Sequence, residues 1–375
     1  MDSEAKILIL YGSAGHGHEN AARAVEEACR RAAPRAAVRL ADALDFSVPF
    51  FARSYRRTYL FLIDRLPWIW GFFYFLFDFR LANWFVRRLR RIVNAVFGKG
   101  LERLLIEENP SVLVCTHFFP LEVAAALKKR GKIRSKLMIV VTDYLPHFFW
   151  VDDAADFYAV ALPETAEGLK TRGVPEFKIR VLGIPIEAKF ETRRRRADAA
   201  SAAGVRSDVF TALLTSGGAG IGNGRRIAGC LLDIQKPVQL LTVCGNNRGL
   251  FEELSSLASC VPDRLKVFGF VKNMDVLMEA SDLVIGKSGG LTLTECLAKN
   301  KPMIVIRPVP GQETRNARCA ALYGAALVAL SVRDAVRQTQ NVMDDPTLLR
   351  RLTEGAAGMA RPHAALDIAK WILAL

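Results

Sequence analysis

The stretch at residues 281–295, SDLVIGKSGGLTLTE, decides the fold of the second half of the chain. Residues 283–285 form a short apolar run typical of a buried strand, and residues 286–290 form a glycine-containing loop. Residues 296–298 are predicted to lie in the first turns of a helix. A helix that follows such a loop offers free N–H groups and a partial positive charge to an anion. The alternative is a glycine turn that only packs a helix on a sheet.

The rest of the second half repeats the alternation of strand and helix that this stretch predicts. A second glycine-rich loop, at residues 215–220, follows the first of the predicted strands. Predicted strands cover residues 210–214, 238–244, 265–268, 283–285 and 302–306, and predicted helices cover residues 225–234, 250–259 and 274–280.

The first half shows the same alternation, beginning with a strand at residues 7–10 and a glycine-rich loop at residues 11–18. Further predicted strands cover residues 38–41, 112–115, 137–142, 156–160 and 181–185, and predicted helices cover residues 19–33, 100–108, 120–130 and 165–172. We therefore predict an α/β protein of two doubly wound, Rossmann-like domains, residues 1–190 and 191–375. Because ligands bind at the carboxyl ends of parallel strands, the two glycine loops are expected to face a shared cleft. The last helix is a candidate to pack back on the N-terminal domain.

Composition narrows the classes of protein that the 375 residues can form. Hydrophobic residues make up 51%, which suffices for a core. The seven cysteines are scattered without a CxxC pair, which favours reduced thiols and disfavours a disulfide framework or a zinc site. No basic segment precedes the first strand, so we expect no signal peptide. The net charge of +14 indicates an anionic partner, such as nucleic acid, anionic lipid or a phosphorylated substrate.

Residues 50–97 interrupt the alternation with a basic and aromatic segment. Residues 50–100 hold ten Lys or Arg against two Asp, and sixteen of the 34 aromatic residues. The uncharged run at residues 66–77 is shorter than the roughly 20 residues of a membrane-spanning helix. Aromatic residues interleaved with Arg are typical of a surface that lies among lipid headgroups. The residues assigned to this surface are Trp68, Trp70, Phe72, Trp84, Arg87, Arg88, Arg90 and Arg91.

Two alternatives remain for this segment. It could be a solvated basic helix beside an aromatic core. Nucleic-acid binding is the third interpretation, and it is disfavoured because the apolar runs exceed what base stacking requires.

Five motifs, taken in order and at their spacing, give the chain a family resemblance. They are Gly15-His16-Gly17-His18; Val141-Thr142-Asp143-Tyr144 with His147 and Trp150; Gly269-Phe270-Val271 with Met274; Lys287 to Glu295; and Pro310-Gly311-Gln312-Glu313 with Asn316. Over nearly its whole length the chain resembles the GT-B glycosyltransferases of family 28 that include monogalactosyldiacylglycerol synthases and processive diacylglycerol glucosyltransferases. It is more distantly similar to the peptidoglycan GlcNAc transferase.

The resemblance implies an inverting reaction in which a base takes the proton of an acceptor hydroxyl. His18 takes the role of the base, since histidine titrates near neutral pH. Asp143 would orient or assist it, and a helix-cap or turn aspartate is the alternative interpretation of that residue. Gly17, His147 and Trp150 would shape the acceptor side. His117 is open between an acceptor-side and a structural role.

The resemblance also implies a UDP-sugar site in the second domain. Phe270 and the Val271 backbone would receive the uracil, and Glu295 the ribose hydroxyls. Gln312 and Glu313 would bind the sugar. The diphosphate would lie on Ser216, Gly217 and Gly218 and on the N–H groups of Ser288, Gly289, Gly290 and Leu291, beside Lys287 and Thr292. Backbone donors of this kind stabilise a leaving diphosphate, so no metal or other cofactor is expected.

The expected function is transfer of a hexose from a UDP-sugar to the hydroxyl of diacylglycerol, which makes a glycolipid. The protein is expected to act as a peripheral enzyme at the anionic cytoplasmic face of a membrane, without a nucleic-acid partner. Alternatives are a UDP-sugar transferase for another lipid-linked acceptor, such as a polyprenyl diphosphate or sterol, and a UDP-sugar epimerase on the same fold. A binding module that has lost its chemistry is the non-enzymatic alternative.

Overall fold

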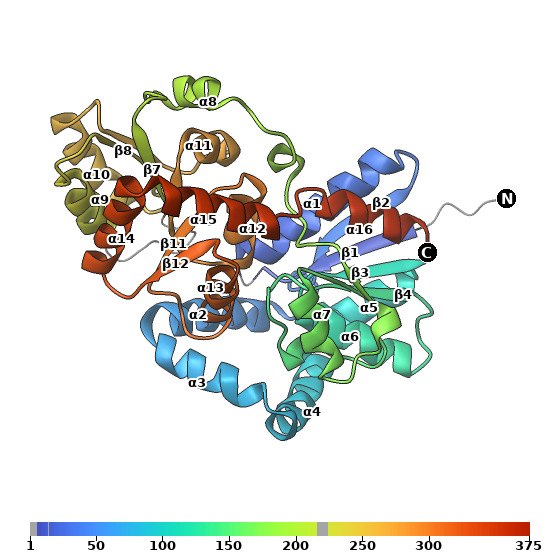
Figure 1. The fold of residues 1–375 in the computed structure, drawn as a ribbon. Helices are drawn as coiled ribbons and strands as arrows, with labels where there is room; N and C mark the ends of the chain where they lie inside the picture. The colour runs from blue at the N-terminus through green and yellow to red at the C-terminus, as the bar shows by residue number, and fades with distance from the viewer. Residues whose placement is uncertain (1–5, 14, 216–223) are drawn as a thin grey trace. The chain divides into compact units, whose positions relative to one another are not determined.

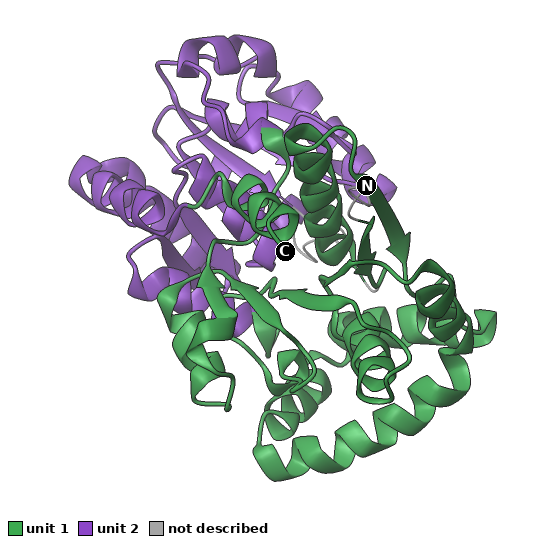
Figure 2. Ribbon diagram, turned by 90° about the vertical axis from the view of Figure 1, so that its right-hand side faces the viewer, with its two compact units in different colours: residues 1–188, 309–312, 361–375 green, residues 189–308, 313–360 purple. Residues whose placement is uncertain are grey.

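The computed structural model describes residues 6–13, 15–215 and 224–375. The chain divides into two compact units, coloured green and purple in Figure 2. The first unit comprises Met1–Ala188, Val309–Gln312 and Arg361–Leu375, and the second comprises Lys189–Pro308 and Glu313–Ala360. The division near residue 190 lies close to the predicted boundary. Two segments of the C-terminal half, Val309–Gln312 and Arg361–Leu375, belong to the first unit, and only the return of the last helix was predicted as an option.

The first unit is built on a six-stranded parallel sheet of order β2-β1-β3-β4-β5-β6. Alternate residues of β1 enter different cores, because successive side chains point to opposite faces of a strand: Leu8 and Leu10 on one face, Ile7 and Ile9 on the other. Both faces are therefore covered, as is usual for parallel sheets. The strands are β1 (Lys6–Tyr11), β2 (Ala37–Asp42), β3 (Val112–Cys115), β4 (Lys136–Val140), β5 (Phe157–Val160) and β6 (Ile179–Val181).

Helices cover both faces of this sheet. They are α1 (His16–Ala32), α5 (Lys99–Glu108), α6 (Phe118–Lys129), α7 (Pro163–Lys170) and α16 (Ala364–Leu373), with the short 3₁₀ turns η1 (Phe148–Trp150), η2 (Glu176–Lys178) and η3 (Ala188–Phe190) near them in sequence. The last helix, α16, packs beside α1, as Figure 1 shows. Its Trp371 lies edge-on to Phe157 of β5, with ring centroids 5.3 Å apart.

Three further helices are inserted between β2 and α5 and follow one another as a bent succession (Figure 1). They are α2 (Pro49–Arg65), α3 (Pro67–Phe77) and α4 (Arg80–Phe97). The α2 helix ends before Pro67, because the residue preceding a proline disfavours helical backbone, and α3 continues at an angle of 110° to α2. Within the described residues no single helix is long and apolar enough to cross a membrane, and α2 and α3 meet that criterion only as a bent pair.

The second unit has its own six-stranded parallel sheet, of order β12-β11-β10-β7-β8-β9. Its strands are β7 (Phe210–Thr215), β8 (Val238–Val243), β9 (Leu265–Phe268), β10 (Leu283–Gly286), β11 (Met303–Ile306) and β12 (Ala326–Ala329). Its helices are α8 (Arg196–Ala203), α9 (Gly224–Leu232), α10 (Arg248–Cys260), α11 (Met274–Ala280), α12 (Gly290–Ala298), α13 (Gln312–Leu322), α14 (Val332–Asp344) and α15 (Pro346–Met359). The strand β12 and the helices α8 and α13 to α15 were not predicted.

In both units the order in which successive strands are added to the sheet reverses beside the first strand. In the first unit β1 lies between β2 and β3, and in the second β7 lies between β10 and β8. Ligands of doubly wound sheets bind outside the carboxyl ends of the strands at such switch points. The glycine-rich loop that follows β1 is therefore placed at the ligand-binding edge of the first sheet, whereas most of the second glycine-rich loop lies outside the described residues.

Candidate active site

His18 lies in the first turn of α1. The sequence had predicted it at the end of the preceding loop, so that prediction was wrong. The helix begins at His16 because Gly15 has an extended backbone (φ −171°, ψ 166°) that ends the loop. Residue 18 is therefore held by helical backbone near the positive end of the helix dipole. A positive charge is disfavoured there, which keeps an imidazole in its neutral form.

The hydrogen bonds of His18 fix which ring nitrogen is basic. Its Nδ1 lies 2.7 Å from the backbone oxygen of Thr116 and 3.1 Å from Oγ1 of Thr142. A carbonyl oxygen only accepts, so Nδ1 carries the hydrogen and Nε2 keeps its lone pair. Thr116 Oγ1 in turn donates to the His18 backbone oxygen at 2.9 Å. Two hydrogen bonds with Thr116, the residue after β3, thus hold His18 in place, and Nε2 is the basic atom of the neutral ring.

Burial lowers the pKa of His18 to about 4, although the hydrogen bond to the Thr116 carbonyl partly offsets this effect. The ring packs against the rings of His117 and Trp150, with centroid distances of 4.7 and 6.2 Å. At neutral pH the side chain is therefore uncharged and can accept a proton. The same Thr116 carbonyl would stabilise the imidazolium that forms.

Asp143 lies just beyond β4 and is held by Trp150. The indole Nε1 of Trp150 donates to Asp143 Oδ2 at 3.2 Å, and Trp150 is buried. Since the Trp150 ring also packs near His18, one tryptophan connects the predicted base and the predicted assisting carboxylate. This placement suits the predicted role of Asp143, and the role itself stays a prediction.

The structure gives His117 and His147 structural bonds. His117 is buried and its Nδ1 accepts from the backbone N–H of Phe119 at 3.1 Å, which caps the start of α6. Burial and the neighbouring His18 hold the pKa of His117 well below its usual range.

His147 is only 2% exposed. Its Nδ1 accepts from Phe149 N–H at 3.0 Å and its Nε2 donates to the Tyr74 carbonyl at 2.8 Å. Both ring nitrogens bind backbone groups, and the side chain joins α3 to the loop after β4. A direct contact of the His147 ring nitrogens with the acceptor therefore does not fit, and the predicted part of this residue on the acceptor side is narrowed to a role in holding α3.

Helices α2, α3 and α4 carry a basic–aromatic surface, defined here as their exposed aromatic, aliphatic and arginine side chains. Trp68, Phe72 and Trp84 are 68%, 62% and 55% exposed. Trp70, predicted to join them, is instead half-buried and lies edge-on to Tyr59, with centroids 5.3 Å apart. Other exposed apolar members are Phe50, Leu60, Phe61, Phe73, Phe75, Leu76, Leu81, Phe85, Leu89, Ile92 and Val96, and Phe79, which lies between α3 and α4, is also exposed.

The four arginines of α4 do not act together, which corrects the prediction that grouped them. Arg88 and Arg91 are exposed beside the apolar side chains. Arg87 instead pairs with the buried Asp152. Arg90 donates from Nε to Glu122 at 2.8 Å and lies 4.2 Å from the centre of the Phe149 ring. Helical periodicity explains why the four arginines have two kinds of surroundings. Residues 87 and 90 lie on one face of α4, and this face packs toward Asp152 and Glu122 of the first unit.

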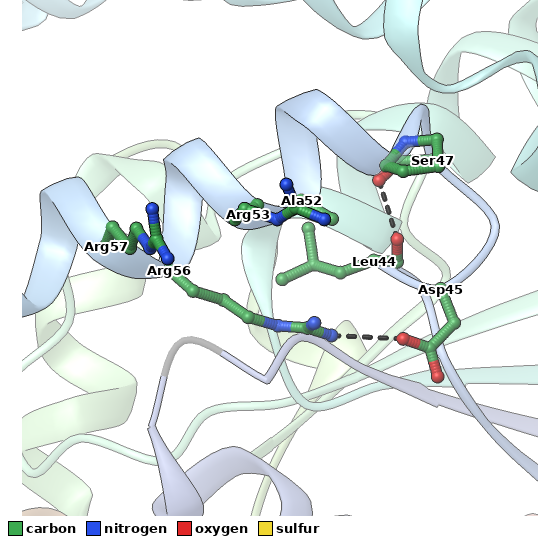
Figure 3. A pocket seen from close by; sticks show the side chains of 8 residues that line it. Leu44, Asp45, Ser47, Ala52, Arg53, Arg56 and Arg57 are labelled. Carbon is green, nitrogen blue, oxygen red and sulfur yellow. Dashed lines mark hydrogen bonds and ion pairs between the residues drawn. The ribbon is translucent and has the colours of Figure 1, made fainter.

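A pocket of about 570 Å³ opens at the start of α2 (Figure 3). One of the arginines that line the pocket, Arg56, donates a hydrogen bond to Asp45 at 3.0 Å, drawn as a dashed line in Figure 3. Arg56 also donates to Asp42 Oδ2 at 2.8 Å and to Ser13 Oγ at 2.7 Å. Sequence reasoning missed this residue, which fastens α2 to the glycine-rich loop before His18. The pocket is lined by Leu44, Asp45, Ser47, Pro49, Ala52, Arg53, Arg56 and Arg57.

In the second unit α12 begins at Gly290, six residues before the predicted start of the helix. Gly289 has extended backbone and no described side chain caps it, so the first N–H groups of α12 are available to an anion. Leu291, Leu293 and Leu297 are buried and explain the early start. Glu295 is therefore a helical residue, half-exposed in the second turn.

The loop before α12 is fixed by two hydrogen bonds. Ser288 is fully buried, and its Oγ donates to the backbone oxygen of Glu313 at 2.8 Å. Asn316 Nδ2 donates to the Ser288 carbonyl at 3.1 Å. Ser288 thus connects the loop before α12 to α13 through hydrogen bonds with Glu313 and Asn316. Its predicted contribution to diphosphate binding, through the backbone N–H, is compatible with this buried side chain and stays a prediction.

The remaining donor-side predictions occupy different positions. Phe270 is 72% exposed in the loop after β9, and Val271 beside it is half-exposed, as are Lys287, Gly289, Gly290 and Thr292. Gln312 belongs by its contacts to the first unit, where its Nε2 donates to Tyr59 OH at 3.4 Å, whereas Glu313 belongs to the second. Ser216, Gly217 and Gly218 lie outside the described residues. Among the residues described, no three His, Cys, Asp or Glu side chains form a group suited to a metal ion.

Two family models match the chain. The model for monogalactosyldiacylglycerol (MGDG) synthase matches residues 18–186, and the model for the glycosyltransferase family 28 C-terminal domain matches residues 225–344. Processive diacylglycerol beta-glucosyltransferases of Bacillus pumilus (strain SAFR-032) and Bacillus cereus (strain B4264) are each 30% identical to the chain. The alignments cover 98% and 100% of this chain and 94% and 95% of those proteins.

Solved structures support the fold. MurG of Acinetobacter baumannii has a TM-score of 0.64 at 17% identity and covers 99% of this chain, with 100% of its own length matched. The UDP-GlcNAc 2-epimerase of Neisseria meningitidis, bound to UDP-GlcNAc, has a TM-score of 0.63 at 13% identity, with the same coverage. At such identities the likeness concerns the GT-B architecture alone. The full-length relatives and the two family models together show that the chain belongs to the family 28 glycosyltransferases, in the group of monogalactosyldiacylglycerol synthases and processive diacylglycerol glucosyltransferases.

Proposed function

We propose that this protein transfers a hexose from a UDP-sugar to the hydroxyl of diacylglycerol and so makes a glycolipid. The observation that carries the proposal is the state of His18: a neutral imidazole in the first turn of α1, with Nδ1 bound to the Thr116 carbonyl and Nε2 left basic. The full-length relatives, named diacylglycerol beta-glucosyltransferases, supply the substrate class and favour glucose as the sugar.

The reaction follows from these groups. Nε2 of His18 takes the proton of the acceptor hydroxyl while that oxygen attacks the anomeric carbon of the sugar. A new carbon–oxygen bond forms on one face, and the bond to UDP breaks on the other with its electron pair leaving on the diphosphate. The configuration at the anomeric carbon is therefore inverted. The imidazolium is held by the Thr116 carbonyl and later releases its proton to solvent.

Stabilisation of the leaving diphosphate is assigned to the start of α12. Its uncapped N–H groups and helix dipole favour negative charge, which is the ordinary basis of phosphate binding at helix N-termini. In this proposal no metal ion or other cofactor takes part. Glu295, one turn further on, is proposed to bind the ribose hydroxyls, and the exposed Phe270 to stack on the uracil.

We further propose that the basic–aromatic surface docks the enzyme on the anionic cytoplasmic face of a membrane. Diacylglycerol stays in the bilayer, so an enzyme that uses it must approach the headgroup layer. Exposed Trp and Phe suit that layer. Arg88 and Arg91 would each add about 1 kcal/mol of attraction to anionic lipid. The support for this part is the exposure of these side chains on one set of helices.

The experiment that tests the proposal is incubation of the purified protein with diacylglycerol vesicles and UDP-glucose, UDP-galactose or UDP-GlcNAc in turn. Mass spectrometry of the lipid fraction identifies the products. Hexosyl-diacylglycerol is the expected product, with UDP-glucose as the best donor. Product only with a polyprenyl diphosphate or a sterol, or an epimerised UDP-sugar without any glycolipid, would overturn the proposed acceptor.

A further inference from the structure

The segment Val309–Gln312 leaves the second sheet after β11 and packs in the first unit on α2 and α3. Gly71 of α3 is the closest approach. A Cβ atom built on Gly71 would lie 2.4 Å from Cβ of Pro310, a distance that real side chains do not adopt. The absence of a side chain at Gly71 therefore lets the Pro310 ring rest directly on the helix.

Gly311 makes the next contact. Its φ of +111° is a backbone conformation that other residues rarely adopt. A Cβ atom there would lie 3.1 Å from Cγ of Tyr74 and 3.3 Å from Nε1 of Trp70. The backbone of Gly311 is thus pressed against two aromatic rings of α3. Two consecutive positions of this segment are therefore fitted to α3 without room for another methyl group.

Gln312 completes the contact with α2. Its Nε2 donates to the hydroxyl of Tyr59 at 3.4 Å. Tyr59 is itself fixed, because its ring lies edge-on to Trp70, and Trp70 packs on Tyr74 with centroids 6.1 Å apart. We name Tyr59, Trp70, Gly71 and Tyr74 the aromatic seat. It fixes the direction of the Gln312 amide by one hydrogen bond and by the packing of the two residues before it.

We propose that the aromatic seat positions Gln312 to bind the sugar of the donor, so that the helices carrying the lipid-facing surface also set the affinity for the UDP-sugar. The inference rests on the proposed function, because it takes Gln312 to hydrogen-bond the transferred hexose. One amide N–H of Gln312 is directed to Tyr59 OH, which leaves Oε1 and the second N–H for sugar hydroxyls. Tyr59 and Gly71 are positioning residues, since they act through Gln312.

The two sides of α3 support this double use. Trp70, Gly71 and Tyr74 turn toward the 309–312 segment, whereas Trp68 and Phe72 on the same helix are exposed. In this proposal one side of α3 docks on lipid, and the opposite side holds the segment Val309–Gln312. UDP without a sugar makes no use of Gln312, so the seat should distinguish intact UDP-sugar from UDP.

The main test is Gly71→Ala, with affinities for UDP-glucose and for UDP measured separately by calorimetry without lipid. The added methyl would force Pro310 off the helix and displace Gln312. We expect affinity for UDP-glucose to fall about 10-fold or more, with UDP affinity within 2-fold of wild type. Gly229→Ala in α9 is the matched control, because a Cβ there meets nothing within 4 Å. Equal losses for both ligands, or no loss for either, would overturn the inference.

Two further variants guard against a folding defect. Tyr59→Phe removes only the hydroxyl and should weaken UDP-glucose about 2- to 10-fold, the range of one neutral hydrogen bond. Pro310→Gly removes the atom that a methyl at residue 71 would meet. Adding Gly71→Ala to Pro310→Gly should therefore cost much less than Gly71→Ala alone, as a double-mutant cycle would measure. An undiminished cost would contradict the seat.

Failure of the inference and failure of the proposed function give different results. A wild-type protein that binds UDP-glucose and makes no glycolipid with diacylglycerol vesicles contradicts the proposed acceptor, and the binding comparison still tests the seat. A wild-type protein that binds neither UDP nor UDP-glucose overturns both. Normal glycolipid synthesis with unchanged UDP-glucose affinity in Gly71→Ala and Tyr59→Phe overturns the seat alone.

Discussion

The predicted catalytic region of the first unit and the predicted donor region of the second use the chain differently. Around His18 the proposed chemistry uses a side chain held by distant partners, Thr116 and Thr142. Around α12 the proposed diphosphate binding uses backbone N–H groups that follow a glycine turn, and hydrogen bonds of Ser288 and Asn316 hold the loop. Substitutions should therefore separate chemistry from nucleotide binding.

The largest expected effect is that of His18→Ala. Removing a general base costs typically about 10²- to 10⁴-fold in turnover, whereas affinity for UDP should stay within 2-fold. Turnover is measured with diacylglycerol vesicles and UDP binding by calorimetry. His16→Ala, an exposed histidine in the same turn, is the control. A loss in His16→Ala as large as in His18→Ala would remove the distinction on which the assignment rests.

The donor region gives the opposite separation. Glu295→Ala should weaken UDP binding by roughly 1.5–3 kcal/mol, the value of a hydrogen bond to a charged group. Turnover at saturating UDP-sugar should change much less than with His18→Ala. Titration of UDP by calorimetry measures the effect. Unchanged UDP affinity would refute the assignment of Glu295 to the ribose.

The two faces of α4 sharpen the comparison within the first unit. Arg90→Gln should lower the free energy of unfolding by about 1–3 kcal/mol, because it leaves the buried carboxylate of Glu122 without its cation. Binding to anionic vesicles should change little. Thermal or chemical unfolding measures the first quantity and vesicle co-sedimentation the second. Stability equal to wild type would show that Arg90 is not needed as a partner of Glu122.

The outward arginines should behave in the reverse manner. Replacing Arg88 and Arg91 together by Gln should weaken binding to anionic vesicles by about 2 kcal/mol at low salt, and the stability should stay near that of wild type. The difference should shrink as salt is raised, since screening removes the attraction. Salt-independent binding of both proteins would mean that this face does not read lipid charge.

The smallest expected effect is that of mild acid on the base. Because the pKa of His18 is lowered to about 4, activity should change little from pH 7 to pH 5.5 and fall only as the pH approaches 4. Acid should also lower the free energy of unfolding. The folded state favours neutral His18, so its contribution to stability is complete above the ordinary histidine pKa near 6.5 and is lost progressively as the pH falls from there toward 4. A plot of kcat/KM against pH measures the acid limb. An acid limb centred near pH 6.5 would contradict a lowered pKa of His18.

Much of the fold could be predicted because parallel strands buried on both faces are visible as apolar runs. The predicted strands of both halves are present, and the glycine loops follow β1 and β7 as expected. The start of α12 was placed too late, since the leucines at 291, 293 and 297 were not taken as a buried helical face. The strand β12, which is short and alanine-rich, gave too weak a pattern.

Candidate site residues could be named from the sequence where a motif contains them, and their contacts could not be predicted where a distant partner makes them. Arg87 and Arg90 differ from Arg88 and Arg91 only in facing Asp152 and Glu122, which are 65 and 32 residues away in sequence. Helical spacing alone would have separated the two pairs. It does not say which pair turns inward. The same holds for His147, whose backbone partner Tyr74 belongs to another helix.

The bonds of Arg56 have a consequence for protein engineering. An obvious variant for testing the proposed membrane docking would lack residues 50–97. That deletion would also remove the cation that faces Asp42 at 2.8 Å and Glu122's partner Arg90. Both carboxylates are buried and would lose their compensating charge, while Ser13, which precedes α1, would lose a donor. Helices α2 to α4 are thus not a detachable module: their outer side chains can be replaced, whereas removing the helices would leave the first unit with uncompensated buried charge.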